Sequence, residues 1–185
     1  MTCEIGIFAD DDIMYVENYS DIIFDAYLKY KNADIICFWV ESKNPERKNK
    51  KIHIKKVNFL NVMKIASFEI TFKKKSILDN NLRFDENLGA GCRINRGEEQ
   101  KFLIDALKRN LKIIFINKKI AEVNHLNSTW FKKYDESFFR IQGEVFKKLY
   151  PKLYKFVIIQ YAIRKRNLYK KTFKIKEVIK FMISI

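Results

Sequence analysis

Short apolar runs alternate with amphipathic segments over the first part of the chain. Residues 4–9 and 35–40 are mainly apolar and rich in β-branched or aromatic side chains, which predicts two buried strands. Between them, apolar side chains recur at helical spacing over residues 22–30, and Asn18 stands where it can cap that helix. The order strand, helix, strand predicts an α/β domain with a parallel sheet.

A second group of elements follows in the middle of the chain. Residues 67–72 alternate between polar and apolar side chains, as a half-buried strand does. Residues 97–109 begin with acidic side chains and continue with the spacing of an amphipathic helix. We expect residues 111–116 and 120–124 to form two further strands, joined by a three-residue polar turn.

The last 50 residues have a helical pattern and a strong excess of Lys and Arg. A helix to about residue 148, a second helix starting near Pro151 and a basic amphipathic segment at 173–185 are expected. We therefore divide the chain into a core, residues 1–134, and a C-terminal helical extension, residues 135–185. The apolar stripe of the second helix includes Leu153, Phe156, Val157, Tyr161 and Ile163.

Composition places the chain among folded proteins with a polyanionic partner. Of 185 residues, 48% are hydrophobic and 15% aromatic, which excludes a disordered chain. No apolar run approaches the roughly 20 residues that cross a bilayer, and the start has no pattern of a signal peptide. The three cysteines have no metal-type spacing, which favours reduced thiols and a cytoplasmic location. The net charge of +15 fits nucleic acid, an anionic membrane or a phosphorylated substrate.

Three consecutive carboxylates, Asp10, Asp11 and Asp12, come directly after the first predicted strand. Such carboxylates repel one another, so a fold that gathers them at the end of a strand favours a bound divalent cation. If the strand continues through them, Asp10 and Asp12 share one face. The alternative is a solvated acidic turn that caps the following helix.

Three further features are candidates for a site. Gly89 and Gly91 mark a loop where the backbone must bend or approach a ligand closely, which makes it a candidate substrate rim. Glu98 and Glu99 begin a helix, where acidic residues ordinarily complement the helix dipole. His125 follows a predicted strand and either makes a structural hydrogen bond or, beside an acidic pocket, ligates a metal.

The order of these features resembles family 2 glycosyltransferases of the GT-A fold, in particular bacterial enzymes that build capsular or surface polysaccharides. The resemblance runs from about Glu4 to Tyr169 and includes the aspartates, the Phe84-Asp85-Glu86 turn, the glycine loop and the Gly97-Glu98-Glu99 helix start. It implies an α/β fold: a partial GT-A, Rossmann-like mixed sheet flanked by helices, with a helical basic C-terminal tail.

The resemblance also implies a role for each acidic residue. Asp10 and Asp12 match the acidic positions of the DXD motif, which holds Mg²⁺ or Mn²⁺ against the diphosphate of a nucleotide sugar, and Asp11 takes the middle position. Glu99 matches the acidic residue that acts as general base on the acceptor hydroxyl. Glu98 is the alternative base, because this chain has Glu where Asp is commoner.

The implied activity is inverting transfer of a sugar from a nucleotide sugar, with a UDP-sugar expected, to a glycan or lipid-linked glycan acceptor. By the same resemblance, His125 adds a metal or diphosphate contact. Trp130 either stacks on a sugar ring or packs in the core. The enzyme would act in the cytoplasm or at the inner face of the cell membrane. The basic tail either contacts anionic lipid there or packs against the core of its own domain.

The chain departs from the family at its start. Family members carry a segment before the aspartate strand that binds the nucleotide base and ribose, whereas this chain begins almost at the aspartates. We expect either one part of a split enzyme with a separately encoded N-terminal half, or a truncated, non-catalytic fragment. A basic nucleic-acid-binding protein is disfavoured, because the lysines are dispersed over nearly every element and no binding motif is present.

Overall fold

The structure is a computed structural model that describes residues 4–42, 55–124 and 133–184. The chain divides into two compact units, which are described separately. The first, here called the sheet unit, comprises residues 1–83 and 102–128. The second, here called the helical unit, comprises residues 84–101 and 129–185. Among the described residues, no helix is both long and apolar enough to cross a bilayer.

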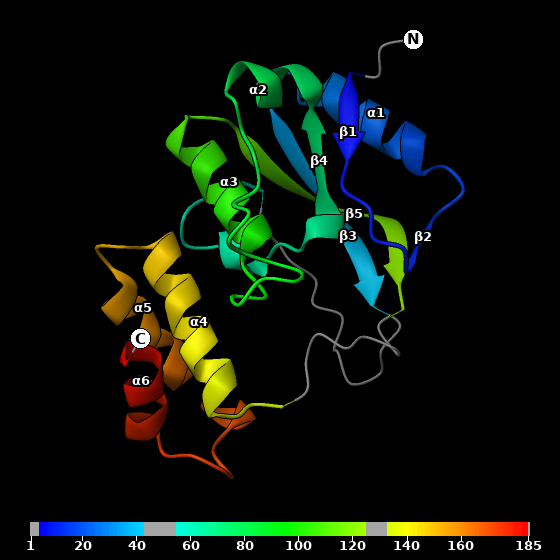
Figure 1. Ribbon diagram of the computed structural model, residues 1–185. Helices are drawn as coiled ribbons and strands as arrows, with labels where there is room; N and C mark the ends of the chain where they lie inside the picture. The colour runs from blue at the N-terminus through cyan, green and yellow to red at the C-terminus, as the bar shows by residue number, and fades with distance from the viewer. Residues whose placement is uncertain (1–3, 43–54, 125–132, 185) are drawn as a thin grey trace. The chain divides into compact units, whose positions relative to one another are not determined.

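The sheet unit contains a five-stranded mixed sheet with the strand order β1-β4-β3-β5-β2 (Figure 1). Only the central pair, β3 and β5, is parallel, and the other three pairs are antiparallel. The expected parallel sheet is therefore mixed, because β4 lies between β1 and β3 and runs opposite to both. The strands are β1 Ile5–Ile7, β2 Ile13–Tyr15, β3 Ile35–Ser42, β4 Ile70–Lys73 and β5 Ile113–Val123.

The aspartates connect the two edge strands of this sheet. β1 pairs with β4 at one edge, and β2, a three-residue strand that the sequence pattern did not predict, pairs with β5 at the other. Residues 8–12 therefore run past one end of the sheet. Because β1, β3 and β5 share one direction, that end is where their carboxyl ends lie, the usual location of ligand sites in α/β folds.

The two strands expected around a turn at residues 117–119 form one strand, β5, so this prediction is wrong. Phe38 of β3 pairs with Ile116, and the next residue, Trp39, pairs with Lys119. Asn117 and Lys118 therefore form a bulge. A polar run is ambiguous by itself, because it suits a hairpin turn and an exposed bulge equally. The eight-residue strand β3 decides between them, since it pairs with β5 on both sides of the bulge.

Helix α1, Tyr19–Lys29, covers one face of the sheet. Its buried residues Ile23, Ala26 and Tyr27 pack in a core cluster with alternate residues of β3, as the helical spacing predicted. The Tyr27 hydroxyl accepts a hydrogen bond from the backbone N–H of Ile36 (3.2 Å) and lies 3.1 Å from the hydroxyl of Thr71. The Asn18 side chain forms no capping hydrogen bond, so packing rather than capping fixes this helix.

Helix α3, Glu98–Lys108, contributes its later turns to the sheet unit. Phe102, Leu103 and Ala106 are buried there, and the rings of Phe102 and Phe8 lie 5.4 Å apart. In Figure 1, α1 lies behind the sheet and this part of α3 in front of it. The short helix α2, Lys74–Asp79, follows β4. The expected α/β fold, a mixed sheet flanked by helices, is confirmed.

The predicted strand at residues 67–72 is confirmed only in its second half. Ser67–Glu69 forms a short 3-10 turn, as does Val62–Lys64, and β4 starts at Ile70. The turn buries Glu69, whose carboxylate accepts a hydrogen bond from the backbone N–H of Ala66 (2.9 Å). Alternation in the sequence had placed this carboxylate on a solvent-facing side of a strand.

The helical unit contains α4 Glu136–Leu149, α5 Tyr154–Arg164 and α6 Ile175–Ile183. Asp135 caps α4 by accepting a hydrogen bond from the backbone N–H of Phe138 (2.9 Å). Helices α4 and α6 approach closely at Gly143, where a Cβ atom would lie 2.1 Å from the carbonyl oxygen of Met182. The core of this unit is formed mainly by Phe139, Val145, Phe146, Leu149, Ile158, Ala162, Tyr169, Val178 and Met182.

The apolar stripe noted on the second C-terminal helix does not coincide with the buried face of that helix. In α5, Ile158 and Ala162 are buried, whereas Phe156 and Ile163 are 67% and 59% exposed. Apolar side chains occur on all sides of this helix, so periodicity could not identify its inner face. Packing against α4 and α6 selects the face that contains Ile158.

Replacing Gly143 by Ala should destabilise the protein by about 1–3 kcal/mol, because the new methyl group would overlap backbone atoms of α6 that cannot rotate away. Thermal or urea unfolding of the two proteins measures the difference. Lys147→Ala, an exposed substitution in the same helix, is the matched control and should change stability little. Equal stabilities of Gly143→Ala and the parent chain would contradict the close approach.

Candidate functional site

The three aspartates form an exposed turn in the sheet unit. A shared face for Asp10 and Asp12 was expected only if the first strand continued through them. Strand β1 ends at Ile7, so strand alternation does not set the direction of these side chains. Asp10 and Asp11 are exposed and Asp12 is half-buried. The carboxylate of Asp10 accepts a long hydrogen bond from the Ser67 hydroxyl (3.4 Å), and the carbonyl oxygen of Asp12 accepts one from Asn124 N–H (3.3 Å). These contacts connect the turn to two other segments of the sheet unit.

A buried carboxylate two residues after Ser67 was missed by sequence reasoning. Glu69 is 6% exposed, and burial raises its pKa to about 7 although backbone N–H groups of Ala66 and Val40 oppose that shift. A glutamate in an alternating segment gives no signal of burial, because the pattern assigns it to the solvent side. Only the 3-10 turn reveals its position.

The aspartates fit one kind of cation site. Carboxylate oxygens suit Mg²⁺ and Mn²⁺, and magnesium in enzymes is often held by one or two carboxylates together with phosphate oxygens of the substrate. Among the described residues, no group of three or more His, Cys, Asp or Glu side chains is placed to hold an ion. The aspartates supply the oxygen donors that such a cation takes, and a metal at this turn stays a prediction.

The glycine loop, Gly89 to Gly91, lies in the helical unit and has a backbone that favours glycine. Gly89 and Gly91 have φ angles of +97° and +78°. The N–H of Gly89 donates to the carbonyl of Ile94 (2.9 Å), and its own carbonyl accepts from Cys92 N–H (3.1 Å). A Cβ atom on Gly89 would lie 2.8 Å from the carboxyl carbon of Glu98, whereas one on Gly91 would meet nothing within 4 Å. The sequence suggested that a ligand approaches this loop closely. At Gly89 the group that approaches closely is the Glu98 carboxyl group.

Glu98 and Glu99 form a pair of neighbouring carboxyl groups in the first turn of α3. One oxygen of Glu98 is buried and has no hydrogen-bond partner among the described residues. Burial, followed by the charge of Glu98, raises the pKa of Glu99 to about 7. An acidic residue that only complements a helix dipole is normally solvated. Glu98 and Glu99 are half-buried and one Glu98 oxygen is covered, so this pair is less solvated than such a residue.

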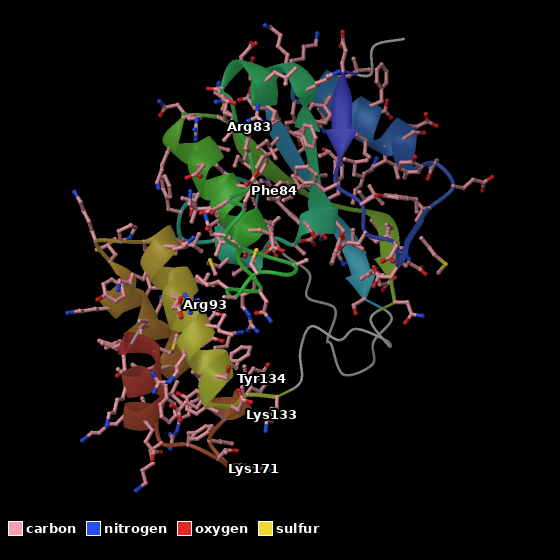
Figure 2. The ribbon with its side chains drawn as sticks, in the orientation of Figure 1. Arg83, Phe84, Arg93, Lys133, Tyr134 and Lys171 are labelled. Carbon is pink, nitrogen blue, oxygen red and sulfur yellow. The ribbon has the colours of Figure 1, made fainter. Side chains whose placement is uncertain are left out.

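Ion pairs fix the segment before α3 to helix α4. Arg93, labelled in Figure 2, donates through its two terminal nitrogens to both carboxylate oxygens of Glu144, and Lys148 lies 3.4 Å from a carboxylate oxygen of Asp85. The guanidinium of Arg96 stacks over the Phe138 ring at 4.4 Å. Sequence reasoning missed these arginines, because basic residues occur throughout the chain and their partners are about 40 or more residues away.

The structure brings some of the predicted site residues together within each unit. Gly89, Glu98 and Glu99 lie together in the helical unit, whereas Asp10 to Asp12 belong to the sheet unit. His125 and Trp130 lie outside the described residues. The roles expected of these residues stay predictions.

A cavity of about 380 Å³ in the sheet unit does not belong to the candidate site. It is lined by residues that include Leu28, Lys31, Ala33 and Lys112, which lie at the amino ends of β3 and β5 or at the end of α1. The aspartates lie at the opposite end of the sheet. Lys29, Tyr30, Asn32 and Ile114 complete the lining of this cavity.

Comparison with known proteins gives matches among solved structures. No family model matches the sequence, and no curated protein matches it. The structure of S. aureus TarS 1–349 with UDP matches 99% of this chain and 56% of that chain, with a TM-score of 0.58 and 15% identity. The complex of TarS 1–349 with UDP-GlcNAc matches 91% and 50%, with a TM-score of 0.56 and 16% identity.

This chain has a glycosyltransferase-like fold. At these identities the likeness establishes the fold alone. The chain spans about half the length of TarS 1–349 and 31% of the longer TarS structure. The expected partial Rossmann-like fold is thereby confirmed, whereas the capsular type is not.

The buried carboxyl groups should make the protein less stable as pH rises. The folded state binds the Glu99 proton more tightly than the unfolded state, because the folded pKa lies near 7 and the ordinary value is 4.5. The resulting stabilisation is complete below about pH 4.5 and is lost as pH rises through about 7, by at most about 3 kcal/mol. We expect Glu99→Gln to flatten the dependence of melting temperature on pH over this range.

Glu69 contributes with the same sign, so the double variant Glu69→Gln/Glu99→Gln should be flatter still. Glu86→Gln, an exposed substitution in the same segment as Glu99, should keep the slope of the parent chain. An unchanged slope in Glu99→Gln would show that this carboxyl group is solvated.

Proposed function

We propose that this chain transfers a sugar from a nucleotide sugar to a glycan or lipid-linked glycan acceptor, as a family 2 glycosyltransferase of the capsular or surface-polysaccharide type. The observation that carries the proposal is the likeness of the fold to TarS, which was solved with UDP-GlcNAc and with UDP. Those complexes support a UDP-sugar as donor. The half-buried pair Glu98–Glu99 and the aspartate turn would supply the two kinds of carboxylate that the reaction needs.

On the donor side, Asp10 and Asp12 would hold Mg²⁺ or Mn²⁺ together with the diphosphate, and Asp11 is the alternative ligand. When bound, the cation supplies charge neutralisation for the departing nucleoside diphosphate. The contact between Ser67 and Asp10 orients one of these carboxylates. Asp10 and Asp11 are exposed and Asp12 is half-buried, which leaves carboxylate oxygens of the turn accessible to a ligand from solution.

On the acceptor side, Glu99 accepts the proton of the attacking hydroxyl group. A carboxylate with a pKa near 7 is suited to this step, because a base works best when its pKa is close to the working pH. The hydroxyl oxygen forms a bond to the anomeric carbon as the bond from that carbon to the diphosphate oxygen breaks, with inversion. Glu98, held against Gly89, keeps a second carboxyl group beside the base and is the alternative base.

The remaining expectations complete the proposal. Gly91, beside which the space is open, forms the substrate rim together with Gly89. Trp130 stacks on a sugar ring, and His125 contacts the metal or the diphosphate. The protein would act in the cytoplasm near the inner face of the cell membrane. The alternative is a non-catalytic fragment.

Calorimetric titration of UDP into the chain, with and without Mn²⁺, tests the donor side. We expect binding that depends on the metal and that weakens at least about tenfold in Asp12→Asn, because one carboxylate ligand is lost. Asp25→Asn, an exposed substitution on α1, is the matched control and should bind as the parent chain does. Equal binding by Asp12→Asn would refute the metal site, and no binding by the folded chain would favour the non-catalytic alternative.

The rate of sugar transfer, followed as UDP release from a UDP-sugar with a glycan acceptor present, tests the acceptor side. Glu99→Gln should lower this rate by about 10²–10⁴-fold while the affinity for UDP stays unchanged, because the residue acts on the acceptor proton. In the parent chain the rate should rise with pH through about 7. If Glu98→Gln is inactive and Glu99→Gln is not, Glu98 is the base.

A further inference from the structure

Helix α5 has two apolar faces, only one of which is used inside the helical unit. Ile158 and Ala162 are fully buried, and the ring of Tyr161 packs edge-on against Phe146 with centroids 5.2 Å apart. On the opposite side, Phe156, Ile159 and Ile163 are 67%, 43% and 59% exposed. A helix that is apolar on all sides normally has all its sides covered.

The exposed residues form one continuous stripe. Positions 156, 159 and 163 are three, four and seven apart, so their side chains lie on the same side of the helix. Leu153, which is 62% exposed, extends this stripe just before the first turn. We call Leu153, Phe156, Ile159 and Ile163 the outer stripe of α5. Large apolar side chains grouped in this way mark an interaction surface more often than scattered ones do.

The surroundings of the outer stripe are uniformly basic. Between Glu144 and Glu177 the chain contains eleven Lys and Arg residues and no Asp or Glu. Lys152, Lys155 and Arg164 lie at the start, along and at the end of α5, and all three are exposed. Figure 2 labels Lys171, which is also exposed and lies in the segment between α5 and α6. Any partner of this surface must therefore combine negative charge with an apolar layer.

An anionic lipid surface meets both requirements. Protein interfaces are depleted of lysine, whereas helices that lie in a membrane surface combine bulky apolar residues on one side with Lys and Arg around them. The basic residues are attracted to anionic headgroups, and the apolar side chains enter the boundary of the acyl chains. A second protein surface would have to bury the lysines or pair each of them with an acid.

We propose that the outer stripe of α5 docks on an anionic phospholipid surface, with Lys152, Lys155 and Arg164 contacting the headgroups. This assigns membrane contact to α5 rather than to the apolar face of the last segment, because Val178 and Met182 of α6 are fully buried. The helix would lie parallel to the membrane, and the proposal holds independently of the sugar-transfer activity.

Co-sedimentation with vesicles tests the proposal on the full chain. We expect binding to vesicles of phosphatidylcholine with phosphatidylglycerol, and at least about tenfold weaker binding to phosphatidylcholine alone. The variant Phe156→Ser/Ile159→Ser/Ile163→Ser should lose at least about tenfold in affinity for the anionic vesicles. Phe24→Ser/Leu28→Ser is the matched control, because it removes exposed apolar side chains from α1 in the sheet unit and should bind as the parent chain does.

Further variants and measurements separate the other outcomes. Lys152→Gln/Lys155→Gln/Arg164→Gln should also weaken binding to the anionic vesicles. Because salt screens the attraction of these residues to the headgroups, this loss of affinity should be smaller at high salt. If circular dichroism shows that the triple serine variant is folded and it binds the vesicles as well as the parent chain does, the outer stripe does not contribute to binding. Binding is then adsorption of a basic protein, and the proposal is overturned. The proposal is also overturned if the parent chain does not bind the vesicles. If the parent chain is then a dimer by analytical ultracentrifugation and the triple serine variant is a monomer, the outer stripe is a contact between two copies of the chain.

Discussion

The parallel pairing of β3 with β5 is the interaction on which the aspartate end of the sheet depends. β4 and β1 are joined to β3 on one side, and β2 is joined to β5 on the other. The aspartate turn links β1 to β2, so its two ends are fixed only while both halves of the sheet stay together. Pairing of β3 with β5 resumes after the bulge at Asn117–Lys118, and the β5 residues 121–123 pair there with β3 on one side and β2 on the other. Continuous pairing around a polar bulge thus places the candidate ligands.

Burial separates the carboxylates of this protein into two chemical kinds. Asp10 and Asp11 are exposed, so their carboxylate oxygens are accessible to a cation. Glu99 is largely buried beside Glu98, and the cost of placing charge there raises its pKa towards neutrality. Enzymes that need one ionised group and one proton acceptor commonly give them such contrasting surroundings. This contrast supports the assignment of different roles to the two groups more strongly than either motif does.

The sequence predicted the elements whose pattern is long and one-sided, and failed where tertiary contacts decide. Helix α1 has clear periodicity and strand β3 begins with an unbroken apolar run, and each was expected within a few residues of its observed bounds. Strand β2 has three residues and α5 is apolar on all sides, so neither has a pattern to interpret. The acidic motifs among the candidate site residues can be read directly from the sequence. The burial of Glu69 cannot, because it depends on a 3-10 turn.

The two glycines of the loop have different physical reasons to be glycine. Both have positive φ angles, but a side chain on Gly89 would also collide with the Glu98 carboxyl group, whereas the space beside Gly91 is open. Gly89 is therefore part of what holds Glu98 in place, and Glu98 in turn raises the pKa of Glu99. Gly91 has no such packing role, so its only requirement within the described structure is conformational. Replacing Gly91 by Ala would therefore meet only the cost of the positive φ angle, whereas the same change at Gly89 would also displace the Glu98 carboxyl group.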